Sequence, residues 1–182
     1  MSKLRPPLGP QDHVQGNPDA AIELIEYGDF ECPYCGRAHR IVKVLQEALG
    51  GDLLFAWRNF PLAQVHPHAL RAAAAAEAAG LQGRFWEMHD MLFEHQDALE
   101  DADLLAYAEA LGLDMERFAA DLDSDEVADR VRADFLSGAR SGVNGTPTFF
   151  VNGERYDGSW ELDAFLAYLR VLLPERPAAG PP

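Results

Sequence analysis

The sequence predicts an α/β protein in which a block of helices interrupts a mixed β-sheet. Three observations lead to this fold class: a strand-helix-strand order near the N-terminus, about 80 residues of helical pattern from 66 to 143, and a strand pair followed by a closing helix. A chain of 182 residues can bury roughly 70% of the surface that it exposes when unfolded. We therefore expect one domain over residues 12–173, with a core of 17–65 and 144–173 and a helical insertion of 66–143.

The first core segment reads as a parallel strand pair joined by a helix. Residues 21–27 (AIELIEY) are apolar on both faces, as in a central strand that is covered on two sides. From Pro33, apolar residues recur every three or four positions until Gly50-Gly51, which is typical of an amphipathic helix. A second strand, residues 53–60, ends before Pro61, and a helical crossover between two strands implies parallel pairing.

The remaining chain predicts four or five helices, a β-hairpin and a last helix. Punctuation by Gly and Asp divides residues 66–143 into the helices. Strands are expected at 146–151 and 155–157 around Asn152-Gly153, a dipeptide typical of a type I′ turn. The last helix should span 160–173 with Ser159 as N-cap, and the Pro-rich ends, 1–11 and 174–182, should be flexible.

Composition excludes two classes of partner. The net charge is −15, and the 15 basic residues form no run, so binding to nucleic acid or to an anionic membrane is not expected. The first 16 residues lack the apolar stretch of a signal peptide, which predicts a cytoplasmic protein, although an exported mature chain with a new Met would look the same. The sequence makes no prediction of oligomeric state.

The motif that carries chemistry is Cys32-Pro33-Tyr34-Cys35, at the junction of the first strand and its helix. Unpaired N–H groups and the positive end of the dipole at a helix N-terminus stabilise a thiolate, and such sites lower a thiol pKa to roughly 3.5–7.5. Cys32 at the helix tip can be exposed, whereas Cys35, one turn later, points to the core. We expect Cys32 to attack a disulfide and Cys35 to resolve the mixed disulfide.

Competing interpretations of the cysteines are weaker. Zinc needs further ligands, and the six histidines show no spacing that supplies them beside Cys32 and Cys35. Haem attachment needs His where Gly36 stands. Inert buried cysteines would not explain the proline between them at a helix start. We therefore expect no metal and no cofactor beyond the cysteine pair, with glutathione as an optional co-substrate.

The chain resembles the soluble branch of the DsbA-like thioredoxin-fold family over about residues 12–173. The resemblance rests on EYGDFECPYCG at 26–36, on GTPTFFVNG at 145–153 and on the helical block between them. It implies a thioredoxin-like fold and a cis Pro147 after Thr146, placed against the cysteines where a client segment can bind. Pro33 and Tyr34 would complete that surface.

Glu26 occupies the position of a buried acidic residue in that family. Its parity in the strand independently matches Ile22 and Leu24, and burial would raise its pKa and suit it to proton exchange with Cys35. The alternative is a strand carboxylate paired with a Lys or Arg of a helix.

Two functions follow as hypotheses. The first is a thiol-disulfide oxidoreductase acting on protein clients, with a redox partner protein or glutathione to recycle it. The second is a redox-sensing or chaperone-like module that binds clients on a thioredoxin scaffold. Pro33-Tyr34 also occurs in glutaredoxins, but these place a single helix where this chain has its insertion. The direction of electron flow does not follow from the motif.

Overall fold

The computed structural model describes residues 2–174 and has a five-stranded mixed sheet with the strand order β1-β3-β2-β4-β5. The strands are β1 (His13–Gly16), β2 (Ile22–Gly28), β3 (Leu53–Asn59), β4 (Thr148–Val151) and β5 (Glu154–Tyr156). β2 and β3 pair in parallel, and the other pairs are antiparallel. The α/β class and the thioredoxin-like arrangement predicted from the sequence are confirmed.

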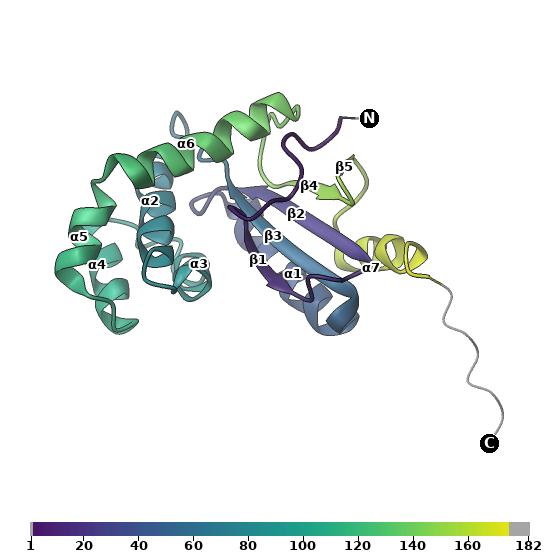
Figure 1. Ribbon diagram of the computed structural model, residues 1–182, viewed down its shortest axis with the longest axis horizontal. Helices are drawn as coiled ribbons and strands as arrows, with labels where there is room; N and C mark the ends of the chain where they lie inside the picture. The colour runs from purple at the N-terminus through teal and green to yellow at the C-terminus, as the bar shows by residue number, and fades with distance from the viewer. Residues whose placement is uncertain (1, 175–182) are drawn as a thin grey trace, which may run out of the picture.

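Helices cover one face and one end of the sheet, and the chain before β1 crosses the other face (Figure 1). α1 (Pro33–Leu49) joins β2 to β3 through a short 3-10 turn, and α7 (Leu162–Val171) closes the chain. The block between β3 and β4 contains five helices, α2 (Ala69–Gly80), α3 (Phe85–Glu94), α4 (Asp101–Ala110), α5 (Met115–Leu122) and α6 (Asp125–Arg140). No helix in residues 2–174 is long and apolar enough to cross a membrane.

The alternation of β2 decides which side chains meet the active-site helix. Ile22 and Leu24 point to the face covered by α1 and α7, where they join Leu45 and Phe165 in one apolar cluster. Ile25 belongs to a separate cluster with residues of the opposite face. Burial on both faces stabilises a central strand and fixes its register, because a slip of one residue would exchange the two sets of side chains.

The segment before β1, which the sequence predicts to be flexible, contacts the rest of the chain at several points. Leu4 is buried, and its N–H donates to Gly153 O at 2.9 Å. Next to this segment Asp12 binds the guanidinium of Arg58 through both carboxylate oxygens, at 2.6 and 2.9 Å. A buried guanidinium needs such partners, so the segment is fixed in place by Arg58. The expected flexible tail at 174–182 lies, beyond Pro174, outside the described residues.

Of two local predictions for the last third of the chain, the structure agrees with one and contradicts the other. Asn152 and Gly153 have φ values of 49° and 80°, as the predicted type I′ turn requires. Ser159, however, is not the N-cap of the last helix: α7 begins at Leu162 with Glu161 at the N-cap position. Ser159 instead lies in a turn in which its carbonyl accepts from Tyr156 Oη at 2.8 Å and its Oγ from Glu161 N at 3.3 Å.

Candidate active site

Cys32 and Cys35 lie where the central strand passes into α1. Cys32 is the N-cap residue, Pro33 is the first helical residue, and Gly36 N donates to Cys32 O at 3.1 Å to begin the helix. Both cysteines are free thiols. Cys35 is fully buried as expected, but Cys32 is only 3% exposed, so the prediction of an exposed attacking thiol is wrong for this conformation. Apolar neighbours, Phe30 and Trp57 among them, pack around the pair.

The two thiols have opposite pKa shifts. The pKa of Cys32 falls to about 5, chiefly because the Cys35 thiol hydrogen-bonds its sulfur, with further help from Thr146 and from the backbone amides of Cys35 and Tyr34. Burial opposes this shift. The pKa of Cys35 is raised well above 9.0 by burial, by its hydrogen bond to Cys32 and by the charge of Glu26. At neutral pH Cys32 is therefore the thiolate and Cys35 the thiol.

The loop before β4 reaches the pair from the other side. Cys32 Sγ lies 3.6 Å from the carbonyl oxygen of Thr146 and can donate to it only as the protonated thiol. The peptide bond between Thr146 and Pro147 is cis. Pairing of Thr148 with Tyr27 aligns this loop with the end of β2. Tyr34, between the cysteines, is 62% exposed and is available to a ligand.

Glu26 is buried on the α1 side of β2, as its parity predicts. Its side chain is 1% exposed, and Oε1 has no hydrogen-bond partner among residues 2–174. Burial and the negative charge of Cys32 raise its pKa well above 4.5. No Lys or Arg within the described chain forms an ion pair with Glu26, so the alternative of a paired strand carboxylate is not what the structure shows.

Two residues that the sequence did not single out hold the motif in place. Gln96, after α3, donates from Nε2 to the carbonyl oxygens of Phe30 at 2.8 Å and Cys32 at 2.9 Å. Asp29 is 1% exposed, and its backbone N–H points to Cys35 Sγ at 3.5 Å. Only the position of Asp29 three residues before Cys32 could have drawn attention to it, and nothing in the sequence marks Gln96.

A cluster of histidines lies behind the active-site helix. Donor atoms of His39, His89 and Asp90 lie within 4.8 Å of one another, as in a candidate metal site. However, Lys43 Nζ is 2.6 Å from the Asp90 carboxylate and already neutralises it. Burial lowers the pKa of His39 to about 4 and also lowers that of His89, whose ring packs on Trp57. The rings of His39 and His89 pack on each other and on the aromatic side chains around Trp57.

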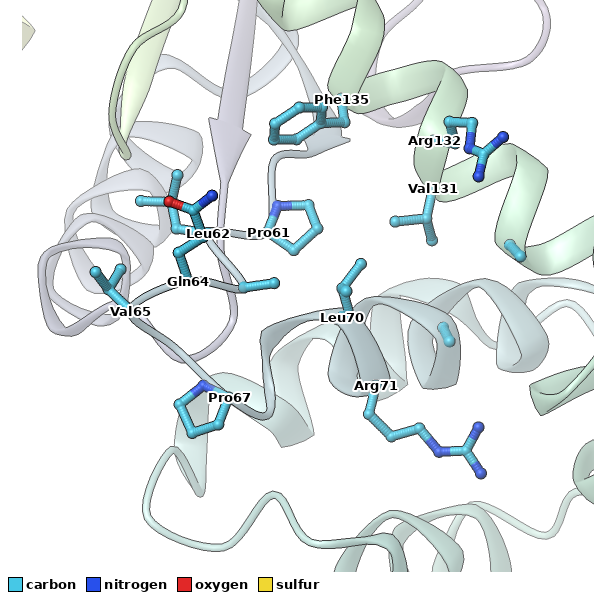
Figure 2. Close-up of a pocket in the computed structure, with 13 residues that line it drawn as sticks. Pro61, Leu62, Gln64, Val65, Pro67, Leu70, Arg71, Val131, Arg132 and Phe135 are labelled. Carbon is cyan, nitrogen blue, oxygen red and sulfur yellow. The ribbon is translucent and has the colours of Figure 1, made fainter.

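An apolar groove of about 940 Å³ runs beside the loop that follows β3 (Figure 2). In the figure Pro61 of this loop lies between Leu70 of α2 and Phe135 of α6. The loop that lines the groove is joined to the segment before the cysteine motif, because Leu62 N donates to the carboxylate of Asp29 at 2.8 Å.

A thioredoxin-like sheet with a cysteine pair at the N-terminus of α1 and a helical insertion defines the fold class of DsbA-type thiol-disulfide oxidoreductases. The sequence profile described as Thioredoxin matches residues 9–170. The chain belongs to this thioredoxin family.

Solved structures agree with this assignment. A thioredoxin-like oxidoreductase from Silicibacter pomeroyi DSS-3 superposes with a TM-score of 0.79 at 28% identity, covering 90% of this chain and 92% of the other. BdbD from Bacillus subtilis gives 0.78 at 24% identity, covering 89% and 92%, and alpha-DsbA1 from Wolbachia pipientis gives 0.77 at 24%, covering 91% and 92%. The last two support the fold alone.

Curated relatives are much longer proteins. Na(+)/H(+) antiporter NhaA 1 of Mycolicibacterium gilvum is 48% identical over 172 residues, which are 93% of this chain but 28% of that protein. NhaA 1 of Salinispora arenicola is 50% identical over 165 residues, 90% of this chain and 25% of that protein. The chain thus spans about a quarter of their length, and the antiporter name describes the longer polypeptides.

Proposed function

We propose that this protein is a thiol-disulfide oxidoreductase that exchanges disulfides with protein clients through Cys32 and Cys35. The observation that carries the proposal is the opposite pKa shift of the two thiols, with Cys32 at about 5 and Cys35 raised. A thiolate such as Cys32 can attack a disulfide directly, whereas a buried thiol with a raised pKa such as Cys35 reacts only after it has lost its proton.

The reaction balances as two exchanges of sulfur. The Cys32 thiolate attacks one sulfur of a client disulfide, forming a mixed disulfide and releasing the first client thiolate. Cys35 then loses its proton and attacks the Cys32 sulfur, which releases the second client thiolate and leaves the protein oxidised and the client reduced by two electrons. The reverse sequence transfers the disulfide to a client dithiol.

Glu26 is the proposed proton carrier for Cys35. When a client thiolate attacks the Cys32 sulfur of the oxidised pair, Cys35 leaves as a buried thiolate that needs a proton. A carboxyl whose pKa is raised by burial keeps its proton to a higher pH than an exposed glutamate and can give it to that sulfur. In the opposite direction the ionised carboxylate accepts the proton of Cys35.

The client is proposed to lie along the Thr146 loop and the groove. An extended segment can hydrogen-bond to the Thr146 backbone beside Cys32, next to the cis bond to Pro147, while Pro33 and the exposed ring of Tyr34 border the approach. No cofactor beyond the cysteine pair is needed. Glutathione or a redox partner protein would return the pair to its starting state, and the potential of the compartment would set the direction.

A Cys35→Ser variant tests the proposed roles. It should accumulate mixed disulfides through Cys32 with an unfolded, disulfide-containing client, whereas the matched Cys32→Ser variant should trap nothing. The wild type should catalyse the reduction of insulin by dithiothreitol. If Cys35→Ser traps no client and the wild type has no turnover, the proposal of an oxidoreductase is wrong.

The second candidate function, a redox-sensing or chaperone-like client-binding module, is favoured by the groove, which is lined mainly by apolar side chains. The same experiment separates the two functions. A client-binding module would suppress aggregation of an unfolded protein in the Cys32→Ser variant as well, and it would show no turnover of insulin.

A further inference from the structure

The carboxylate of Asp29 is a buried junction between the cysteine motif and the loop after β3. Its side chain has no exposed surface. Oδ1 accepts from Glu31 N at 2.8 Å, and Oδ2 accepts from Leu62 N at 2.8 Å. A third contact joins Oδ2 to Nδ1 of His66, also at 2.8 Å. A buried carboxylate with three donors is fixed in position, and it fixes its donors in turn.

The contact with Asp29 gives the His66 ring one defined orientation. Nδ1 carries the hydrogen that faces the carboxylate, so the second nitrogen, Nε2, is the one that gains or loses a proton. The His66 side chain is 20% exposed, so solvent reaches it. The backbone of the same loop is closed by His66 N donating to Leu62 O at 2.9 Å. His66 can therefore change its charge without losing its place.

His66 reaches the cysteine pair through Asp29, whose carboxylate contacts the His66 ring at 2.8 Å and whose backbone N–H points to Cys35 Sγ at 3.5 Å. Burial lowers the pKa of His66, but the hydrogen bond from Asp29 and the charges of Asp29, Cys32 and Glu31 outweigh it and raise the pKa overall. These three residues, all from the segment between β2 and α1, are the groups that act on the ring. Because such coupling is reciprocal, a thiolate that favours the imidazolium is itself favoured by it.

We propose that His66, held by the buried carboxylate of Asp29, is a positioning residue that supplies a positive charge to the Cys32 thiolate and so makes thiol reactivity depend on the protonation of His66. The proposal rests on the proposed function, because it assigns a regulator to the same cysteine pair. It predicts a residue outside the Cys-Pro-Tyr-Cys motif that shifts the balance between the reduced and the oxidised protein.

The sign of the effect follows from the two charge states. Below the pKa of His66 the imidazolium stabilises the thiolate and hence the reduced protein; as the pH rises through that pKa, this stabilisation is lost. Cys32 is already ionised in this range, so the amount of thiolate hardly changes. A less stabilised thiolate is more nucleophilic, with a Brønsted coefficient of about 0.4–0.5. The alkylation rate should therefore rise with Cys32 ionisation, level off, and rise again by less than about twofold as His66 loses its proton.

His66→Asn is the informative variant, because its amide can still donate to Asp29 but carries no charge. His68→Gln is the matched control: His68 lies two residues further on and also binds carboxylates, Glu31 at 2.7 Å and Glu100 at 3.0 Å. Those two carboxylates raise the pKa of His68, and Cys32 is not among the causes.

The first measurement is the alkylation rate of Cys32 against pH. His66→Asn should lose the second rise and move the first to higher pH, whereas His68→Gln should keep the wild-type profile. In His66→Asn the equilibrium constant with glutathione should shift about threefold towards the oxidised protein, a size expected for a screened charge pair. At 29.6 mV per tenfold change, this shift corresponds to about 14 mV. A two-step profile in His66→Asn, or the same shift in His68→Gln, overturns the proposal.

A second measurement needs no variant. The ring proton of His66 can be titrated by NMR in the reduced and in the oxidised wild type, and its pKa should be higher in the reduced protein, where the thiolate is present. Equal values in both states contradict the proposal. If the wild type itself shows no alkylation step below pH 7 and no insulin turnover, the proposed function fails; if it shows both and only the His66 effects are missing, the charge-supply proposal alone fails.

Discussion

Replacing Cys35 with alanine should make Cys32 a weaker acid. The pKa of Cys32 is about 5, and the hydrogen bond from Cys35 is the largest cause. A hydrogen bond to a charged group contributes about 1.5–3 kcal/mol, and one pKa unit corresponds to 1.36 kcal/mol, so Cys35→Ala should raise the pKa by about one to two units. At pH 6 the thiolate fraction should fall from about 90% to about 10–50%.

The assay is the rate of iodoacetamide alkylation from pH 4 to 9, with thiolate absorbance at 240 nm as a second reading. The midpoint of the rate profile should move up by about one to two pH units in the alanine variant, and at pH 9 its more basic thiolate should react about three to ten times faster than that of the wild type. Cys35→Ser is the control, because a hydroxyl can still donate, and its midpoint should move less. An unchanged midpoint in Cys35→Ala would show that the hydrogen bond from Cys35 is not what lowers the pKa of Cys32.

Three further predictions follow from individual contacts. Glu26→Gln should raise the free energy of unfolding by about 1–2 kcal/mol at pH 7 and by little at pH 4. The reason is that a carboxyl whose pKa is raised in the folded state destabilises the fold as the pH rises above 4.5. Urea unfolding at both pH values checks this, and an equal change at both would contradict it. Gly36→Ala should destabilise the protein by about 1–2 kcal/mol in the same assay, because the new Cβ would displace the Gln96 side chain from two carbonyl groups. An unchanged midpoint would show that these two hydrogen bonds of Gln96 do not stabilise the fold. Leu70→Asp should slow insulin reduction severalfold and leave the reduction of a small disulfide unchanged; equal effects on both would remove the groove from client binding.

The sheet and its helical block could be predicted because their sequence patterns are local. The apolar run of β2, the periodicity of α1 and the Asn152-Gly153 turn each specify an element from its own residues. β1 could not be found in this way. It has only four residues and alternates partly buried and exposed positions, and it exists because β3 offers a free edge. Its pairing depends on residues about 40 positions away.

The site divides in the same manner. Cys32, Cys35 and Glu26 could be placed from strand parity and from the start of the helix. The contacts of Gln96 and of His66 join segments that are 64 and 37 residues apart, and no local sequence pattern predicts them. The covering of Cys32 was missed for the same reason, because part of it comes from the loop at Thr146, which is 114 residues away.

The most direct test of disulfide exchange through Cys32 and Cys35 is a redox titration of the wild-type protein in glutathione buffers, with peptide mass analysis of the products. We expect one two-electron transition, with a tenfold change in equilibrium constant per 29.6 mV, and an intramolecular disulfide between Cys32 and Cys35 in the oxidised form. Two independent glutathione adducts, or cysteines that stay reduced at every potential, would contradict it.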